Sequence, residues 1–182
     1  MNHDDHVALL RGGIDQPGGV WADFGSGTGA FTLALAELIG PAGVIYSIEL
    51  DRSALAQQAR SLRERFPTSI VHYCVADFTR PIRDSVPALD GIVMANALHF
   101  QHSPEPIVQL LRSYLRLQGR FILVEYNLEQ GNSAVPYPVS YRQWEDLAQR
   151  CGFTRTQLLM TRPSRFLKEI YSAVSWQIHL EQ

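Results

Sequence analysis

Three glycines at alternate positions, Gly25, Gly27 and Gly29, follow a short apolar run in the stretch VWADFGSGTGAFTLALAELIG, residues 20–40. Glycine lacks a Cβ atom, so it permits sharp turns with positive φ and lets a ligand lie directly against the main chain. Ordering three glycines is entropically expensive for a simple strand-to-helix turn, which is the alternative reading. The spacing therefore predicts a loop that holds a ligand against bare backbone.

Polar side chains follow three further apolar runs. Glu49 ends the second run, Asp77 follows the third and Asn96 lies at the end of the fourth, with His99 three residues later. A carboxylate at such a point can accept hydrogen bonds from two neighbouring hydroxyls, and an imidazole titrates near neutral pH and can receive a proton. Each residue also has a plainer reading: Glu49 as a solvated strand end, Asp77 as a turn residue before Pro81, and His99 as a packed or backbone-bonded side chain.

Alternating strand-like and helical patterns must position these residues. Strands are expected at 20–24, 44–50, 70–76, 91–97 and 120–126, and helices at 32–39, 53–66, 105–117 and 141–151. Asp51, Ser103 and Ser140 are the expected caps of the last three helices, Ser140 with Gln143 in a capping box. Strands that alternate with helices predict a parallel sheet covered by helices on both faces.

Two further strand-like runs, 156–161 and 169–176, end the chain. The loop between them, roughly residues 162–166, is too short for a parallel crossover, so the two runs should form an antiparallel hairpin. The expected fold class is α/β: a single doubly wound, mostly parallel seven-stranded sheet with a reversed C-terminal strand. The Rossmann-like order of elements puts the polar residues above at one edge of that sheet.

Composition limits what the chain can be. Its 182 residues, 46% of them hydrophobic, suit one domain spanning residues 1–182. A net charge of −2 with scattered Lys and Arg gives no footprint for nucleic acid or an anionic membrane. Cys74 and Cys151 are isolated, which argues for reduced thiols and against a zinc cluster. No signal peptide or membrane span is recognisable, so a cytoplasmic protein is expected.

The motifs DFGSGTG (23–29), Glu49, VADF (75–78) and ANALHF (95–100) together resemble the ordered motifs of class I S-adenosylmethionine-dependent methyltransferases. The likeness covers nearly the whole chain, including LRLQGRFILVEY and the terminal hairpin. It is closest to small-molecule methyltransferases of the menaquinone/ubiquinone methylase type. The usual Pro-Gly-Gly before the fifth strand is replaced here by Gln118-Gly119-Arg120, a change in a turn rather than in the cofactor site.

The resemblance implies S-adenosyl-L-methionine as cofactor, S-adenosyl-L-homocysteine as product and no metal ion. It assigns Glu49 to the ribose hydroxyls, Leu50 to the adenine face and Asp77 to the adenine amine. It places the methionine end against the glycine loop. The implied cofactor-binding set is Asp23, Gly25, Ser26, Gly27, Gly29, Glu49, Leu50, Asp77, Phe78, Asn96 and Ala97, and the candidate general base is His99.

Two other functions stay open from the sequence. A nicotinamide dinucleotide enzyme would use G-x-G-x-x-G, and Ala30 here occupies a place that some dinucleotide motifs fill with alanine. Asp23 and VADF, which such a site does not require, favour the methyltransferase. A non-catalytic cofactor-binding module of the same fold is the other alternative. A P-loop is excluded because G-x-x-x-x-G-K-[ST] is missing.

The acceptor is expected to be a small or medium-sized organic molecule, methylated on an O, N or C atom. NALHF lacks the Asn/Asp-Pro-Pro-aromatic motif of nucleic-acid amino-methylases, no acidic cluster suggests a metal-assisted catechol enzyme, and two cysteines are too few for arsenic methylation. We expect the acceptor pocket to be covered by the N-terminal segment with the loop EQGNSAVPYPVSY, or by a second subunit; the protein itself is expected to be a monomer or homodimer. Tyr126, Tyr137, Tyr141 and Trp144 offer aromatic surface, Trp144 more plausibly as a core residue.

Overall fold

Strands in the order β3-β2-β1-β4-β5-β7-β6 form one seven-stranded sheet in the computed structural model, which describes residues 1–164 and 167–177. Their bounds are β1 Val20–Phe24, β2 Val44–Glu49, β3 Ile70–Val75, β4 Leu89–Ala95, β5 Leu115–Tyr126, β6 Arg155–Pro163 and β7 Glu169–Trp176. The first five strands pair in parallel. β7 is antiparallel to both β5 and β6, so the expected reversed strand is confirmed. Residues 165–166 of the hairpin loop lie outside the described residues.

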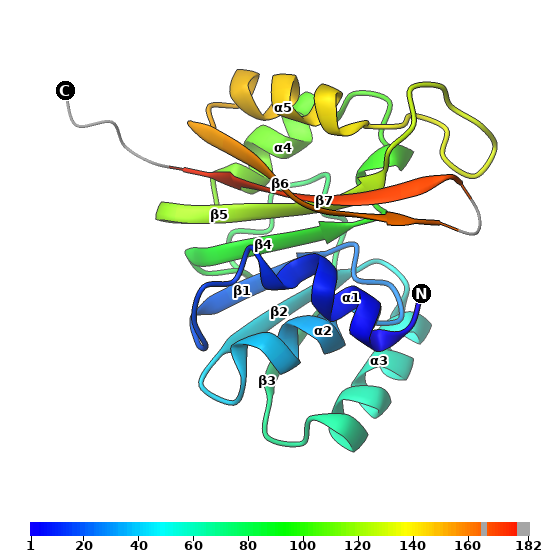
Figure 1. Ribbon diagram of the computed structural model, residues 1–182. Helices are drawn as coiled ribbons and strands as arrows, with labels where there is room; N and C mark the ends of the chain where they lie inside the picture. The colour runs from blue at the N-terminus through cyan, green and yellow to red at the C-terminus, as the bar shows by residue number, and fades with distance from the viewer. Residues whose placement is uncertain (165–166, 178–182) are drawn as a thin grey trace.

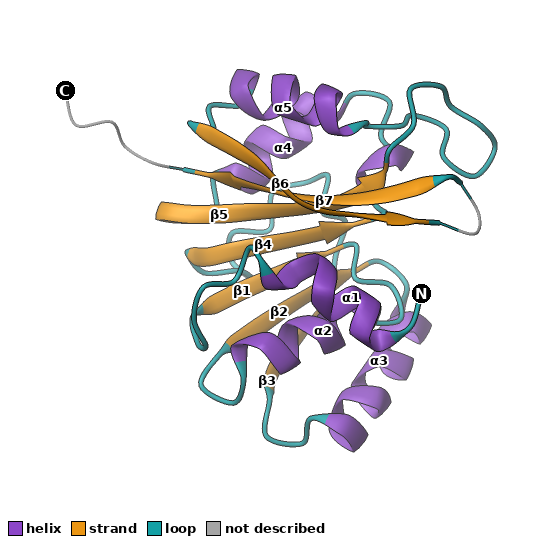
Figure 2. Cartoon of the chain, viewed as in Figure 1, coloured by secondary structure: helices purple, strands orange, loops and turns teal. Residues whose placement is uncertain are grey.

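Helices cover both faces of the sheet (Figure 1). The helices are α1 His3–Arg11, α2 Ala30–Ile39, α3 Arg52–Arg65, α4 Pro104–Arg112 and α5 Tyr141–Arg150, with a short 3-10 turn, η1, at Leu98–Phe100. Apolar side chains of α1, α2 and α3 pack in one core cluster with one face of the strands. Those of α4 and α5 pack in a second cluster on the other face. Figure 2 shows the strands as a layer between the two groups of helices.

Two of the three expected caps are confirmed. Asp51 accepts a hydrogen bond from the Ser53 amide, and Ser140 forms a capping box with Gln143. Ser103 does precede α4, but its side chain accepts no hydrogen bond from the helix; its hydroxyl lies 3.3 Å from Nδ1 of His102 instead.

Helix α4 is shorter than its periodicity predicts. It ends at Arg112, and β5 already begins at Leu115, where the expectation had been helix to residue 117. Leu115 pairs with Leu89 of β4, and the ladder then shifts register before resuming at Gly91 with Arg120. Sheet pairing therefore overrides a helical pattern whose last apolar residue, Leu117, is in fact exposed.

Helix α1 was not predicted from the sequence. Asn2 and Asp5 form a capping box at its start, and the side chains of Val7, Leu9 and Leu10 are buried against α2 and the sheet. The Asn-x-x-Asp pattern before spaced apolar residues carried the signal for this helix.

Because β1 to β5 run in parallel, their carboxyl ends lie at the same edge of the sheet. Every polar residue of the sequence motifs falls at that edge. No helix in the described residues is long and apolar enough to span a membrane. Both cysteines are free thiols.

Candidate cofactor and acceptor site

The three glycines after β1 all have positive φ, 75° for Gly25, 53° for Gly27 and 90° for Gly29. Their surroundings differ. A Cβ on Gly25 would lie 2.7 Å from Cβ of Ala97, and one on Gly29 would lie 2.3 Å from Cγ of Gln58. A Cβ on Gly27 would have nothing within 4 Å. Gly25 and Gly29 are thus required by packing within the protein, and Gly27 is the glycine that faces open space.

Buried polar side chains lie under this loop. The carboxyl oxygen Oδ2 of Asp23 accepts a hydrogen bond of 2.6 Å from the hydroxyl of Thr32 in the first turn of α2. Thr32 in turn accepts one from the Gln58 amide. Ser47 donates to Gln58 at 2.8 Å and lies 2.7 Å from the Ser26 hydroxyl. Burial raises the pKa of Asp23 to about 7, opposed by the Thr32 hydrogen bond and reinforced by the charge of Glu49.

Glu49 at the end of β2 is tied to the glycine loop. Its Oε2 atom accepts a hydrogen bond of 2.9 Å from the Gly27 amide, and Oε1 accepts from the amides of Leu50 and Asp51 at 2.7 and 2.9 Å. A carboxylate has about four acceptor positions and three are used here, so the second position on Oε2 of Glu49 can still receive a hydroxyl donor. Leu50 beside it is 67% exposed, an apolar surface next to the carboxylate.

Asp77 after β3 forms a local turn. Its Oδ1 atom accepts hydrogen bonds from the amide and hydroxyl of Thr79, which together lower its pKa. Asp77 therefore does act as a turn residue, which is the alternative role given to it in the sequence analysis. The ring of Phe78 comes within 3.3 Å of the Cβ position of Gly25, on the side where Ala97 also packs. Residues from the ends of β1, β3 and β4 therefore converge on Gly25.

Asn96 after β4 has φ 51°, a left-handed conformation that is uncommon outside glycine. Its amide donates to the carbonyl of Val124, while its buried Oδ1 atom has no hydrogen-bond partner in the protein. An unusual backbone together with an unpaired buried acceptor is typical of ligand-binding positions.

His99 lies in η1 and forms a buried pair with Glu125 of β5. The Nδ1 atom of His99 lies 2.6 Å from Oε2 of Glu125, and both side chains are almost fully buried. Oε1 of Glu125 accepts from the amides of Leu98 and His99 at 3.0 and 3.2 Å. An acceptor at Nδ1 places the ring proton there, which leaves the Nε2 lone pair free to bind a proton.

Glu125 was missed by the sequence analysis. It lies inside the run RFILVEY, which reads as a strand buried on both faces. A single acidic residue in such a run was the available signal, because a buried carboxylate needs a partner.

A cavity of about 410 Å³ opens beside this pair. Its lining is mostly apolar: Asn96, His99, Phe100, Tyr126, Ala134, Val135 and Leu167. None of these residues carries a fixed charge. A neighbouring cavity of about 510 Å³ shares Tyr126 and includes Met1, Asn2 and Asp5 of the N-terminal segment.

Each expected covering segment lines one of these two cavities: the EQGNSAVPYPVSY loop lines the 410 Å³ cavity, and the N-terminal segment lines only the neighbouring 510 Å³ cavity. Ala134 and Val135 belong to the EQGNSAVPYPVSY loop, whose Tyr137 amide donates to the carbonyl of His99 at 3.0 Å. The β6–β7 turn, which supplies Leu167, had not been expected there. Trp144 is fully buried, which confirms its reading as a core residue.

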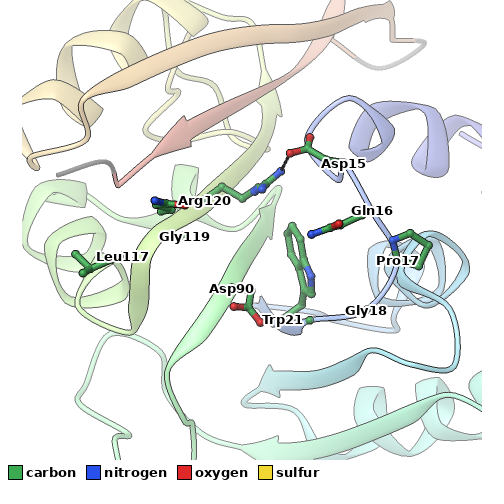
Figure 3. Close-up of a pocket in the computed structure, with 11 residues that line it drawn as sticks. Asp15, Gln16, Pro17, Gly18, Trp21, Asp90, Leu117, Gly119 and Arg120 are labelled. Atoms are coloured by element: carbon green, nitrogen blue, oxygen red, sulfur yellow. Dashed lines mark ion pairs between the residues drawn. The ribbon is translucent and has the colours of Figure 1, made fainter. Parts of the chain in front are cut away.

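Another cavity, of about 330 Å³, lies at the opposite edge of the sheet (Figure 3). Its charged side chains are paired: Arg120 with Asp15 at 2.7 Å, and Asp90 with Arg116 at 2.7 Å. Asp90 also accepts from the Val20 amide. These contacts join the strand starts to the loop before β1. In the described part of the chain, no group of three or more His, Cys, Asp or Glu side chains is arranged to hold a metal ion.

Comparisons with known proteins point in one direction. A family model described as methyltransferase domain matches residues 15–172. No curated protein sequence matches the chain significantly. A Nostoc punctiforme protein assigned as an O-methyltransferase shares 16% identity and a TM-score of 0.74, over 94% of this chain and 56% of its own.

Two further solved structures are similar. The arsenic(III) S-adenosylmethionine methyltransferase of Chlamydomonas reinhardtii has 12% identity and a TM-score of 0.72, over 90% of this chain and 64% of that one. A SAM-dependent methyltransferase of Aquifex aeolicus has 13% identity and a TM-score of 0.69, over 98% of this chain and 100% of that one. At these identities the structures establish the fold, and the family match adds the activity. The chain belongs to the methyltransferase domain family and is a class I S-adenosylmethionine-dependent methyltransferase.

Proposed function

We propose that this enzyme transfers a methyl group from S-adenosylmethionine to a small, uncharged and mostly apolar acceptor bound in the 410 Å³ cavity. The observation that carries the proposal is the buried His99–Glu125 pair. His99 lines that cavity and lies in the segment that directly follows Ala97, and Glu125 holds it from β5. Ala97 packs on Gly25, so the cavity lies next to the glycine loop.

The residues at the strand ends fit the cofactor. Gly27 presents open backbone for the methionine moiety, and Glu49 retains an acceptor position on Oε2 for a ribose hydroxyl. Leu50 and Phe78 supply apolar contact for adenine, with Asp77 for its amine. The unpaired Oδ1 of Asn96 and the carboxyl of Asp23 are suited to the cationic methionine end. Gly29, Ser26 and Gly25 support the loop from below.

The bound cofactor supplies an electrophilic methyl group on a sulfonium whose departure needs no proton. Most of the rate acceleration should therefore come from holding the acceptor in line with that group. The acceptor must still lose a proton as the new bond forms, and Nε2 of His99 receives it. Glu125 holds the ring in the tautomer that leaves Nε2 unprotonated and stabilises the imidazolium that results.

The cavity lining bears on the acceptor class. An anionic acceptor would find no Lys or Arg, and a cationic one no free carboxylate, among the described lining residues. A neutral molecule with one protic group matches the surface. We further propose that the protein is cytoplasmic, uses no metal ion or nucleic acid partner, and acts as a monomer or homodimer.

His99→Ala and Glu125→Gln test this assignment. We expect S-adenosylmethionine affinity by titration calorimetry to stay within about twofold of wild type in His99→Ala. Turnover should fall by about 10²-fold or more, and the acidic limb of the pH–rate profile should disappear. Glu125→Gln should lower turnover by a smaller factor and shift that limb. His102→Ala, an exposed histidine nearby, is the matched control.

Turnover would be followed by release of S-adenosylhomocysteine on a panel of neutral phenols, amines and enolisable ketones. A fall of less than tenfold in His99→Ala with the acidic limb retained would make His99 a wall residue. Binding of NAD in place of S-adenosylmethionine would contradict the cofactor assignment.

A further inference from the structure

The row of buried polar side chains beneath the glycine loop joins that loop to four elements. Ser26 lies in the loop, Ser47 on β2, Gln58 on α3, Thr32 on α2 and Asp23 on β1. Each of these side chains is at most 9% exposed. Buried polar groups of this kind must be paired, and a network is stable only when each donor has an acceptor.

The direction of every hydrogen bond in this series of side chains follows from the bond to Asp23. Oδ2 of Asp23 accepts a hydrogen bond, and the Thr32 hydroxyl is its donor. The Thr32 oxygen can then only accept from Gln58, which turns Nε2 toward Thr32 and Oε1 toward Ser47. Ser47 donates to that oxygen and therefore accepts from Ser26. Every hydrogen bond from Ser26 to Asp23 therefore has a single donor and a single acceptor.

Position 58 needs a donor at one end of the side chain and an acceptor at the other. Glutamine meets that need. An ionised glutamate would offer two acceptors, and Thr32 has one proton for two carboxylates. Gln58 also fills the space that the third glycine leaves, because a Cβ on Gly29 would lie 2.3 Å from its Cγ.

We propose that Gln58 is a positioning residue for the cofactor. It joins α3 to Ser26 through Ser47, and to the first turn of α2 through Thr32, so it holds both ends of the glycine loop in the conformation that receives the methionine moiety. This inference rests on the proposed cofactor site. It assigns a binding function to a residue that touches neither cofactor nor acceptor.

Gln58→Glu is the decisive variant, because a protonated carboxyl has the same donor and acceptor pattern as the amide. The introduced carboxyl would be buried beside Asp23 on β1, which already senses the charge of Glu49 on β2, so its ionisation is strongly disfavoured. Affinity for S-adenosylmethionine and S-adenosylhomocysteine would be measured by titration calorimetry between about pH 5.5 and 8.5.

At the alkaline end we expect Gln58→Glu to bind both ligands about tenfold or more weakly than wild type. The deficit should shrink as the pH falls and the introduced carboxyl becomes protonated. Gln58→Met keeps the length without the polar ends, so its deficit should not shrink with falling pH. Gln57→Glu places the same charge change on an exposed position of α3 and should bind like wild type.

A constant ratio of Gln58→Glu to wild-type affinity across this pH range, or wild-type affinity in Gln58→Met, would overturn the inference. Thermal unfolding checks that each variant is folded. If Gln58→Glu does not fold at alkaline pH, Ser47→Ala, which deprives Gln58 and Ser26 of their shared partner, must weaken cofactor binding or the inference fails. Failure of the wild type to bind either ligand would instead overturn the proposed function.

Discussion

Substitution of Gly27 tests whether the open space beside the glycine loop holds the cofactor. Gly27→Val should abolish detectable S-adenosylmethionine binding, because the branched side chain would occupy the open space that we assign to the methionine moiety. The measurement is titration calorimetry, with circular dichroism to check the fold.

Gly40→Val is a matched control for that variant. Gly40 also has positive φ, 65°, and a Cβ there would likewise meet nothing within 4 Å, but it caps the far end of α2. Both variants force a β-branched residue into a positive-φ conformation. Comparable loss of affinity in the two would mean that strain, and not ligand volume, explains the result.

Among single residues, those whose role follows from their position relative to a strand could be predicted from the sequence. Glycines after a strand and acidic residues at strand ends are visible without a structure. Glu125 and Gln58 were not identified, because each acts through a partner distant in the sequence: Glu125 lies 26 residues from His99, and Gln58 lies 26 from Thr32. No local pattern encodes such a pairing.

Among the elements, the loop between β5 and α5 controls the size of the acceptor cavity. Ala134 lines the cavity and is exposed on the loop, so a larger side chain there can be accommodated without disturbing the core and can extend into the cavity. We expect Ala134→Trp to raise the KM of the acceptor by about tenfold or more while cofactor affinity is unchanged.

Ser133→Trp is the control, because Ser133 is exposed on the same loop and does not line the cavity. An unchanged acceptor KM in Ala134→Trp would show that the acceptor binds elsewhere. A parallel loss in both variants would point to a disturbed loop rather than a filled cavity.

Elements with strong local signals were predicted well. The capping box at Ser140 and the Gly152 that ends α5 are sequence-local features, and both are present in the structure. The end of α4 was predicted wrongly, because apolar spacing through residue 117 satisfies a helix while the pairing of Leu115 with Leu89 depends on β4, far away in the chain. Local periodicity cannot report which strand lies next to a segment.

For the whole molecule, the reversed strand was predictable from loop length alone, since a short connection cannot make a parallel crossover. The cavity walls were less accessible to sequence reasoning. The β5–α5 loop and the β6–β7 turn line the 410 Å³ cavity, and the N-terminal segment lines its neighbour. Only the assembled sheet brings these three segments to one edge.

Asp23 should make global stability depend on pH. Its pKa in the folded protein, about 7, lies above the ordinary aspartate value of 3.8, so the folded state binds more protons than the unfolded state between these values. The free energy of unfolding should therefore fall as the pH rises through that window, by on the order of 4 kcal/mol from this group. Asp23→Asn should remove this slope.

Urea denaturation of wild type and Asp23→Asn at intervals from about pH 4 to 8 measures the difference, in which contributions from other carboxyl groups largely cancel. The variant should gain stability relative to wild type toward alkaline pH. Parallel curves would show that Asp23 is ionised throughout the folded range.

Strand β7 comes after β6 in the chain but lies between β5 and β6 in the sheet. During synthesis, β5 therefore keeps an unpaired edge until residues 169–176 have left the ribosome, and open edges invite pairing with other chains. Glu125 lies opposite Tyr171 in that last ladder. The buried acid that orients His99 is enclosed only when the final described strand inserts, so a nascent chain stalled before β7 presents both an open edge and an unshielded charge to chaperones and proteases.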